Sequence, residues 1–377
     1  MNILFLGPYR QVDGWGNASR NLATSLTHSK HNVTIQPLHF VPNWQVGPLG
    51  EELDRLENNR FDKYDVVIQY ALPHYLTKIP NVINIGVFLL EVNNINNSLW
   101  TYYINQMDAA WVVNDKDINT LKNSKVTIPC ENIPIPIDTE KYSNISVKKY
   151  QFPPNVCDNN TFILYYIGSN EERKNLRDII TTYYLSFKEY DNVLLVLKTN
   201  VGQSNEISEL VTDIQNRLRL YKDNKYYPHI HVINNFLSNE NLALLHQTAH
   251  CYVNLSHGEA CGMDIVDAIG FNSMVITPKN NGTDTYIKDK ISVYTTESPV
   301  DIARPPIPMV FNGNTTWQNI DVLDACSKLK IVYNTYKYKD AAWDKTSKNN
   351  QQYLQRFSFE NTAKLIDSTL EQYVNNN

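Results

Sequence analysis

Cysteine is scarce in this 377-residue chain, and no motif that depends on cysteine is present. The five cysteines are odd in number, lie far apart and never form a Cys-x-x-Cys pair; they are Cys130, Cys157, Cys251, Cys261 and Cys326. This pattern argues against both a disulfide framework and a zinc knuckle. It is typical of a protein kept in a reducing compartment, and we therefore expect a cytoplasmic location.

Long apolar runs are also missing. No segment approaches the roughly 20 consecutive apolar residues that a membrane-spanning helix needs. The opening residues MNILFLGPYRQ contain only a short apolar stretch and no basic segment, so they predict a first β-strand and not a signal peptide. The stretch SRNLATSLTHSKH is only weakly basic, and we expect at most peripheral contact with a membrane.

An excess of positive charge is absent as well. The chain has 34 Lys and Arg against 39 Asp and Glu, which gives a net charge of −5. Proteins that bind nucleic acids normally carry a basic stripe that neutralises phosphates, so we expect no nucleic-acid partner. Any anion that this protein binds must be met by a few local cations.

The sequence has the length and the pattern of two α/β domains. A single domain usually has about 100 to 200 residues, and this chain is longer. Short apolar runs alternate with helical stretches, first from NILFLG through VTIPC to IPIPI (residues 133–137), then from TFILYYIGS to SMVITP. Such alternation is typical of βαβ units in a parallel sheet. We expect two Rossmann-like, doubly wound domains facing a central cleft, with no internal repeat.

A polar, proline-containing stretch at about residues 146–160 lacks periodicity and is the expected linker. The expected domains are residues 1–150 and 151–355. Residues 356–377 are expected to form an amphipathic helix that packs back on the N-terminal domain. In such sheets ligands lie at the carboxyl ends of the strands, so the candidate site residues are sought there.

The loop after the first strand contains glycines and runs into a helix. Gly14, Trp15 and Gly16 precede Ser19, a spacing close to a dinucleotide-binding fingerprint. Glycines and a helix N-terminus allow backbone N–H groups to approach an anion. The third glycine of the fingerprint is missing, and the glycines lie too far beyond the strand. A turn that only connects strand to helix explains these residues about as well.

The second half contains a similar loop that carries cations. Gly168 ends a strand, and Arg173 and Lys174 stand at the expected start of the next helix. Adjacent Arg and Lys side chains at a helix N-terminus suit a diphosphate. The alternative is that they pair with Glu171 and Glu172 on the surface. Lys198 ends the apolar run VLLVLK and is expected at the same edge.

The densest segment is NLSHGEACGMDIVDA, residues 254–268. A strand ends near Ser256, Glu259 lies in a glycine-containing loop, and a helix begins near Met263. Free N–H groups at the start of that helix suit phosphate or hydroxyl oxygens, Glu259 suits a polyol, and Asp267 suits a second diol. The alternative is that Asp264 caps the helix and Glu259 is an ordinary surface acid.

Two patterns suggest a metal but are explained better without one. His246 and His250 have the spacing of a helical zinc site, yet the position of the expected general base is Gln247 and no third ligand is evident. Asp115 and Asp117 form an Asp-x-Asp pattern that fits a helix cap. We therefore expect no metal.

In their order along the chain, these segments resemble the family 4 retaining glycosyltransferases of the GT-B fold, from Asn2 to about Ile287. The residues that carry the resemblance are Gly14-Trp15-Gly16; Phe88, Glu91, Trp100, Asn105, Asp108 and Val112-Val113; Pro136 and Asp138; Arg173-Lys174; Glu259 and Asp267; and Asn281-Gly282-Thr283. The most specific element is the pair of acids Glu259 and Asp267, eight positions apart.

The resemblance implies a role for each residue of the second-half loops. Glu259 and the amides of Ala260, Cys261 and Gly262 would hold the donor sugar. The amides of Met263 and Asp264 would bind the β-phosphate, and Asp267 would bind the ribose. Arg173 and Lys174 would bind the diphosphate. Glu91 would face the sugar from the N-terminal domain.

The chain departs from the family pattern at four of these positions. Ala260 and Cys261 replace a glycine and an aromatic residue, Asp267 replaces a longer Glu, and Asp264 places an acid beside the implied phosphate site. The Asp267 side chain is one methylene shorter than Glu and reaches less far toward a ribose, and Ala260 has less backbone freedom than glycine.

The implied activity is retaining, metal-independent transfer of a hexose from a UDP- or GDP-sugar, which is a co-substrate and the only cofactor expected. The acceptor hydroxyl belongs to a glycan, a lipid-linked or a small-molecule acceptor that the sequence does not identify. Two alternatives stay open. One is a catalytically weakened nucleotide-sugar-binding protein of the same fold, and the other is a dinucleotide-dependent oxidoreductase.

Overall fold

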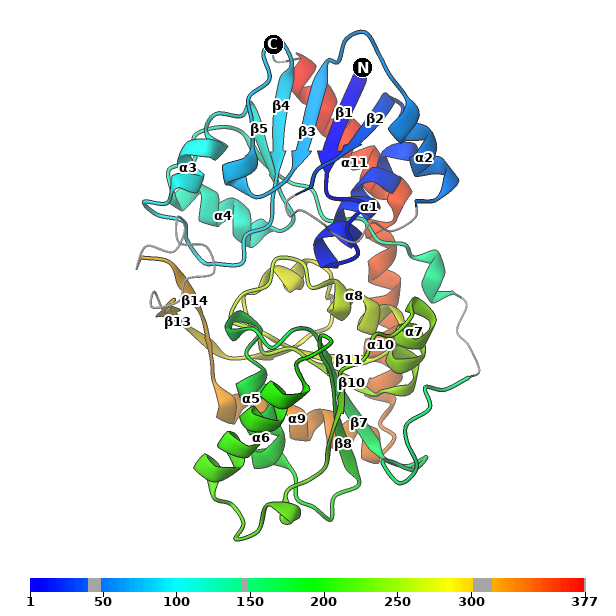
Figure 1. Ribbon diagram of the computed structural model, residues 1–377, viewed down its shortest axis with the longest axis vertical. Coiled ribbons are helices and arrows are strands. Elements are labelled where there is room, and N and C mark those ends of the chain that lie inside the picture. Colours follow the sequence, from blue (N-terminus) through cyan, green and yellow to red (C-terminus); the bar gives the residue numbers. More distant parts are fainter. Residues whose placement is uncertain (40–48, 144–147, 301–313, 376–377) are drawn as a thin grey trace. The chain divides into compact units, whose positions relative to one another are not determined.

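The computed structural model describes residues 1–39, 49–143, 148–300 and 314–375, and the chain folds into two compact units (Figure 1). Unit 1 comprises Met1–Thr139, Pro299–Trp317 and Leu354–Asn377, and unit 2 comprises Glu140–Ser298 and Gln318–Tyr353. Both are α/β, as the sequence predicts.

The passage between the units differs from the expected boundary at residue 150. The chain enters unit 2 after Thr139, ahead of the expected linker, part of which lies outside the described residues. The segment Pro299–Trp317 returns to unit 1, where Val300 and Trp317 join the apolar core. The boundary between the two units therefore follows the packing of buried side chains and not the position of the proline-containing stretch.

Unit 1 is built on a six-stranded parallel sheet with the strand order β2-β1-β3-β4-β5-β6. Its strands are β1 (Asn2–Gly7), β2 (Asn32–Pro37), β3 (Val66–Tyr70), β4 (Ile83–Val87), β5 (Ala109–Val112) and β6 (Cys130–Asn132). Most of these strands are runs of apolar residues because helices cover both faces of a parallel sheet.

The helices of unit 1 include one from the far end of the chain. They are α1 (Gly14–Thr27), α2 (Glu51–Asn58), η1 (Pro73–Tyr75), α3 (Leu99–Ile104), α4 (Asp115–Asn123), η6 (Gln355–Phe357) and α11 (Phe359–Asn375). Helix α11 packs along α1, and Ser25 Oγ donates a hydrogen bond of 2.8 Å to the Phe359 carbonyl (Figure 1). The C-terminal segment thus completes the first sheet's helical layer.

Two strands expected at the edge of this sheet differ in the structure. The run at residues 126–130 contributes only its last residue, Cys130, to the three-residue strand β6. The run at residues 133–137 forms no strand, and Ile137 makes a single bridge to Ser358. Prolines 129, 134 and 136 explain the difference, because proline has no N–H to donate to a strand ladder.

Unit 2 is built on a second six-stranded parallel sheet, with the order β12-β11-β10-β7-β8-β9. Its strands are β7 (Phe162–Ile167), β8 (Val193–Lys198), β9 (Ile230–Ile233), β10 (Cys251–Val253), β11 (Met274–Pro278) and β12 (Ile291–Val293). Its core is rich in aromatic residues, among them Tyr166, Tyr183 and Phe187.

Helices and short 3-10 turns connect these strands. They are η2 (Glu140–Tyr142), η3 (Glu172–Lys174), α5 (Leu176–Ser186), α6 (Ser204–Leu218), η4 (Asn224–Tyr226), α7 (Asn239–Thr248), α8 (Met263–Gly270), η5 (Gly282–Thr285), α9 (Val322–Lys337) and α10 (Ala341–Leu354). Strands β13 (Thr295–Pro299) and β14 (Thr316–Ile320) form a separate two-stranded sheet where the chain passes between the units.

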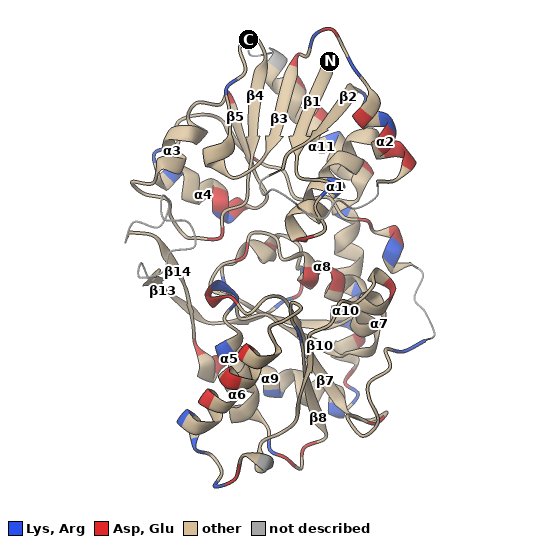
Figure 2. Ribbon diagram, in the orientation of Figure 1, with Lys and Arg blue, Asp and Glu red and all other residues tan. Residues whose placement is uncertain are grey.

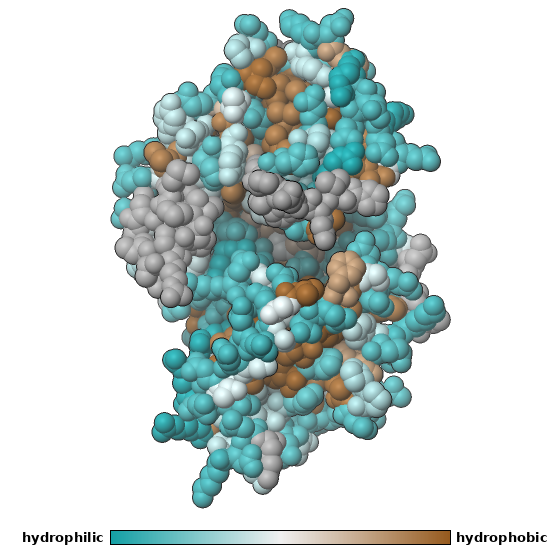
Figure 3. Space-filling model, viewed as in Figure 1, coloured by the Kyte–Doolittle hydropathy of each residue, from teal (hydrophilic) through white to brown (hydrophobic). Residues whose placement is uncertain are grey.

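On the viewed face of the molecule, hydrophilic residues predominate and apolar residues form patches within each unit (Figure 3). Of the helices in the described ranges, none combines the length and the apolar character that crossing a membrane requires.

In each sheet the strand order reverses beside the first strand of the unit. In unit 1 the reversal lies between β1 and β3, and in unit 2 between β7 and β10. Ligands of doubly wound sheets bind outside the carboxyl ends of the strands at such a switch point. The loops after β7 and β10 are those that carry Arg173, Lys174 and Glu259, so the topology itself points to them.

Candidate functional site

Hydrogen bonds join the loop after β7 to the loop after β10. Asn175, in the left-handed conformation with φ 52°, caps α5 and donates from Nδ2 to the Leu255 carbonyl over 3.0 Å. The His257 amide donates to the Arg173 carbonyl over 2.8 Å, and Arg173 donates back to the Gly258 carbonyl over 2.7 Å. These bonds bring the cations of one loop to the acid of the other, and sequence reasoning did not single out Asn175.

Glu259 is held by both cations. Its side chain is 8% exposed, and its Oε2 lies 2.7 Å from Lys174 Nζ and 3.5 Å from an Arg173 nitrogen. Burial opposes ionisation of this carboxyl, but Lys174 and Arg173 outweigh it and hold the pKa of Glu259 below its usual value. Glu259 is therefore a buried, ion-paired carboxylate and not a surface acid. The alternative that Arg173 and Lys174 pair with Glu171 and Glu172 on the surface does not account for these contacts with Glu259.

The turn at Asn281 fixes the backbone of Glu259. Asn281 Oδ1 accepts hydrogen bonds of 2.9 Å from the amides of Glu259 and Gly282, and the Gly282 amide donates to the Glu259 carbonyl over 3.0 Å. Asn281 Nδ2 and Thr283 Oγ1 are buried and have no hydrogen-bond partner within the described ranges. Buried polar groups normally have partners, so water or a ligand is expected to satisfy these two.

Gly262 immediately precedes α8 and has a conformation that suits glycine. Its φ is +65°, and a Cβ atom there would lie 2.8 Å from Thr283 Cγ2. Gly262 is the N-cap and provides no side-chain oxygen, so the alternative that Asp264 caps this helix is wrong. The amides of Met263 and Asp264 belong to the first turn, where N–H groups lack intrahelical acceptors.

Asp264 lies in that first turn among other charges. Removal from water raises its pKa to about 7, the carboxylates of Asp267 and Glu259 add to the shift, and Lys174 opposes it. Near neutral pH this side chain therefore exists in both protonation states. Figure 2 marks the acidic residues of α8 in red.

Asp267 makes contacts that the sequence did not suggest. Its Oδ1 accepts a 2.6 Å hydrogen bond from the Tyr142 hydroxyl and lies 2.5 Å from Lys141 Nζ. The Tyr142 ring packs on Gly270, where a Cβ atom would lie 2.3 Å from it, and edge-on against Phe271 at 5.2 Å between centroids. Asp267 therefore anchors the first residues of unit 2.

Gly168 and Lys198 lie at the neighbouring strand ends. The Gly168 amide donates to the Lys198 carbonyl over 3.0 Å. Lys198 Nζ donates to the Thr199 carbonyl over 2.7 Å, and burial lowers the pKa of Lys198 while the charge of Asp264 opposes that shift. Lys198 therefore adds a half-buried cation within electrostatic reach of α8.

The predicted glycine residues of unit 1 form the first turn of α1 and not the loop before it. Asp13 caps this helix and accepts a 2.8 Å hydrogen bond from the Gly16 amide. A Cβ atom at Gly16 would lie 1.9 Å from the Gln11 carbonyl oxygen, whereas one at Gly14 would meet nothing within 4 Å. The Trp15 ring lies 5.3 Å from that of Tyr70, the last residue of β3.

A partly buried arginine that sequence reasoning missed stabilises this turn. Arg20 donates to the carbonyls of Tyr9 and Gln11 over 2.7 and 2.6 Å. Burial lowers the pKa of Arg20, and Asp13 opposes the shift. The sequence could have indicated this role, because Arg20 follows Gly16 by four positions. In a helix, that spacing places the two residues on the same face.

Glu91 belongs to unit 1, on the loop after β4. Next to it in the same unit is the buried Asp117, whose pKa burial raises to about 7, with Lys116 opposing and Glu91 adding to the shift. The sequence suggested that the Asp115 and Asp117 pattern caps α4. The cap is instead Asn114, whose Oδ1 accepts a hydrogen bond of 2.8 Å from the Asp117 amide.

The histidines at the zinc-like spacing have structural roles. His246 Nδ1 lies 2.9 Å from the Tyr165 hydroxyl, and His250 Nδ1 accepts a 3.0 Å hydrogen bond from the Ile163 amide. Burial lowers the pKa of both to about 4. Within the part of the chain that the structure describes, no three His, Cys, Asp or Glu side chains are grouped to hold a metal ion.

No protein-family profile and no curated protein sequence matches this chain. Solved structures are similar over the whole chain. Sucrose-phosphate synthase from Thermosynechococcus elongatus is 13% identical, with a TM-score of 0.65 over 100% of both chains. HepE of Anabaena, solved with UDP and glucose, is 14% identical, with a TM-score of 0.61 over 99% of this chain and 100% of that one. The N-terminal domain of Candida albicans trehalose-6-phosphate phosphatase is 13% identical, with a TM-score of 0.67 over 98% and 96%.

These comparisons confirm the predicted fold class. Two parallel six-stranded sheets with flanking helices, in two Rossmann-like units, are the GT-B fold. At these identities the likeness extends to the fold alone, and membership of family 4 stays a prediction.

Proposed function

We propose that this protein is a glycosyltransferase that moves a hexose from a UDP-sugar to an acceptor hydroxyl. The observation that carries the proposal is the ion pair between Lys174 and the buried Glu259, which lies where a loop with a second cation meets the start of α8. The GT-B fold supports it, and so does the similarity to HepE, which was solved with UDP and glucose.

The charges of this site suit a nucleoside diphosphate. Arg173, Lys174 and Lys198 are cationic, and the amides of Met263 and Asp264 add the positive potential of a helix N-terminus. When the bond between the anomeric carbon and the phosphate oxygen breaks, negative charge grows on the leaving diphosphate. Fixed cations and amides stabilise that charge in the transition state.

Glu259 is suited to the sugar. Lys174 occupies its Oε2, and we assign its Oε1 to a hydroxyl of the donor sugar. Asn281, which holds the same loop, and Thr283 offer buried polar atoms for further sugar or water contacts. Asp267 retains the proposed ribose contact through Oδ2, because Tyr142 and Lys141 engage its Oδ1.

We propose retention of anomeric configuration without a metal. The acceptor oxygen attacks from the face of the leaving group, the new bond forms to the anomeric carbon, and the acceptor proton passes to the departing phosphate oxygen. Gly14, Trp15, Gly16 and Glu91 are the candidate contributors from unit 1. None of the five cysteines, all of which lie in the described ranges, belongs to a disulfide, and this supports the proposed cytoplasmic setting.

Product analysis tests this function. The protein is incubated with UDP-glucose, other UDP-sugars and GDP-mannose, with and without EDTA, and released nucleotide and glycosylated product are measured. We expect release of UDP, an unchanged anomeric configuration by NMR and no effect of EDTA. Glu259→Gln and Lys174→Ala should each lower the rate by about 100-fold or more, as loss of a transition-state contact does. Glu172→Ala, at an exposed neighbouring position, is the matched control.

A nucleotide-sugar-binding protein without turnover is the second candidate. The engaged Oδ1 of Asp267 and the acid at Asp264 favour it, because both weaken the nucleotide contacts that the resemblance implies. A thermal shift with UDP-sugars that depends on Lys174, but no release of UDP with any acceptor, would establish binding and exclude the transferase.

A further inference from the structure

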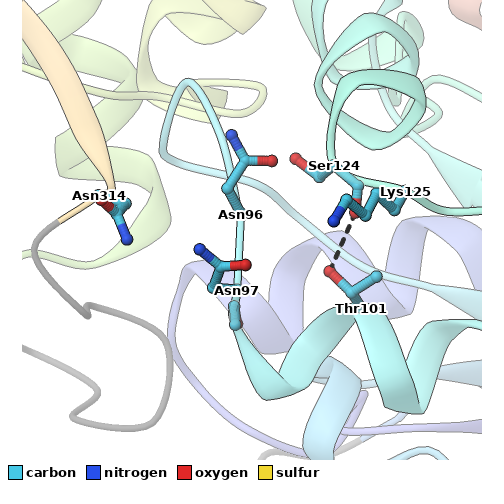
Figure 4. Close-up of a pocket in the computed structure, with 7 residues that line it drawn as sticks. Asn96, Asn97, Thr101, Ser124, Lys125 and Asn314 are labelled. Carbon is cyan, nitrogen blue, oxygen red and sulfur yellow. Dashed lines mark hydrogen bonds between the residues drawn. The ribbon is translucent and has the colours of Figure 1, made fainter.

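Unit 1 contains a cavity of about 560 Å³ that has no place in the proposed donor site (Figure 4). It lies beside the loop that leads into α3. Figure 4 shows the amides of Asn96 and Asn97 on this loop, with Asn314 on one side and Thr101, Ser124 and Lys125 on the other. Ser98 completes the lining.

The backbone around this cavity is fixed by hydrogen bonds. Ser98 Oγ accepts from the Trp100 amide over 3.1 Å and caps α3. Ser124 Oγ accepts from the Ile95 amide over 3.1 Å, and Thr101 Oγ1 donates to the Ser124 carbonyl over 3.3 Å. The loop into α3 is therefore tied to the end of α4, and the cavity is formed before any ligand arrives.

The chemistry of the lining is narrow. The side chains are amides, hydroxyls and one ammonium group, and none of the described lining residues is a carboxylate or an apolar side chain. Most ligand pockets are lined mainly by apolar groups, and this one differs. An apolar ligand therefore finds no complementary surface among the described lining residues. Amides and hydroxyls donate and accept hydrogen bonds, which suits a ligand that presents many hydroxyls.

The positions of the polar groups fit such a ligand further. Ser124 is 2% exposed, while Asn97 and Lys125 are exposed at the rim. The described lining residues include one cation and no acid, so a negative substituent finds a partner at Lys125 and no repulsion from the other side chains among them. Asn97 and Lys125 have left-handed backbones, with φ of 58° and 63°, so glycine can replace either without strain.

We propose that this cavity is a carbohydrate-binding site of unit 1, which takes a sugar unit through the Asn96, Asn97 and Asn314 side and holds a carboxylate or similar anionic substituent at Lys125. The site is additional to the donor loops of unit 2 and does not require the proposed transferase activity.

Saturation-transfer NMR on the full chain tests this site. The probes are glucose, galactose, mannose and N-acetylglucosamine, together with glucuronate, which differs from glucose by a carboxylate in place of the hydroxymethyl group. Saturating UDP is present throughout so that the proposed donor loops are occupied. We expect transfer to at least one neutral sugar and tighter binding of glucuronate than of glucose.

Two glycine variants and a matched control decide the location. The double variant Asn97→Gly, Lys125→Gly should abolish transfer to every probe, and Lys125→Gly alone should remove the preference for glucuronate. Asn155→Gly in unit 2 is the control, because Asn155 is also exposed and left-handed with φ 67°. The double variant should still bind UDP, which separates this site from the donor site and shows that the chain is folded.

Two results overturn the proposal: no transfer to any probe, or transfer that persists in the double variant. Equal binding of glucose and glucuronate, lost in the double variant, supports the sugar site and overturns the role of Lys125. Failure of UDP to bind the unaltered chain would count against the proposed function and not against this site.

Discussion

The Tyr142 hydroxyl donates a 2.6 Å hydrogen bond to Asp267 Oδ1, across 125 positions of the sequence. The bond joins the first turn of unit 2 to α8, the helix that begins at Met263. An acid that the family resemblance assigns to ribose thus also holds the chain where it enters the unit.

Tyr142→Phe separates the two roles of Asp267. We expect it to lower the free energy of unfolding by about 1 kcal/mol, the usual net worth of one hydrogen bond, and to leave UDP affinity within about twofold. Asp267→Ala should cost similar stability and also weaken UDP binding by about tenfold. Denaturant unfolding and calorimetry measure both quantities. Equal UDP affinity in Asp267→Ala and the unaltered chain would show that Asp267 is an anchor alone.

Asp264→Asn should stabilise the protein in mildly alkaline solution. The pKa of Asp264 is raised from 3.8 to about 7, so the folded state holds a proton that the unfolded state has released. The group's ionisation therefore reduces stability as pH rises from about 4 to about 7, and the deficit persists above that. Measured by thermal unfolding, Asp264→Asn should gain on the order of 1 kcal/mol over the unaltered chain at pH 8 and nothing at pH 3.

Asp117→Asn provides the matched control for donor binding. Asp117 is also buried with a pKa of about 7, but it belongs to unit 1. Both variants should be more stable than the unaltered chain at pH 8 and equally stable at pH 3. Only Asp264→Asn should tighten UDP binding at pH 8, because it alone removes a negative charge beside the α8 amides. Tighter binding in both variants would point to a general charge effect.

Gly16→Ala should destabilise unit 1 by about 1 to 3 kcal/mol, because its Cβ would collide with the Gln11 carbonyl and force the turn to shift. Gly14→Ala, in the same helical turn but with open space around it, should be neutral or stabilising by up to about 1 kcal/mol. Urea titration of the two variants measures the difference. Equal stabilities would contradict the close approach of α1 to its preceding loop.

Asn281→Ala should impair the proposed reaction through the position of the loop that carries Glu259. It removes the acceptor of the Glu259 and Gly282 amides, so the loop that presents Glu259 loses its fixed position. We expect a fall of about 10-fold or more in kcat/KM and a loss of about 1 to 3 kcal/mol in stability from the unpaired buried amides. Asn281→Asp keeps the acceptor and should restore much of the stability; a variant equally unstable would argue against this role.

Local patterns in the sequence were sufficient for the alternation of strands and helices and for the positions of the loops. The runs NILFLG and VLLVLK are buried parallel strands, and the helix at Met263 begins where its preceding glycine ends the loop. The prolines at positions 129, 134 and 136 marked the limit, since apolar character alone wrongly suggested strands there.

The sequence by itself thus determined the α/β class and which loops carry acids, cations and glycines, because a few consecutive side chains fix each of these features. Only the tertiary structure decided that Lys174 pairs with Glu259, 85 positions away, that Tyr142 binds Asp267, and that the chain returns to unit 1 at Pro299. Such contacts depend on how whole elements pack and which charges are buried together, and no local periodicity encodes that.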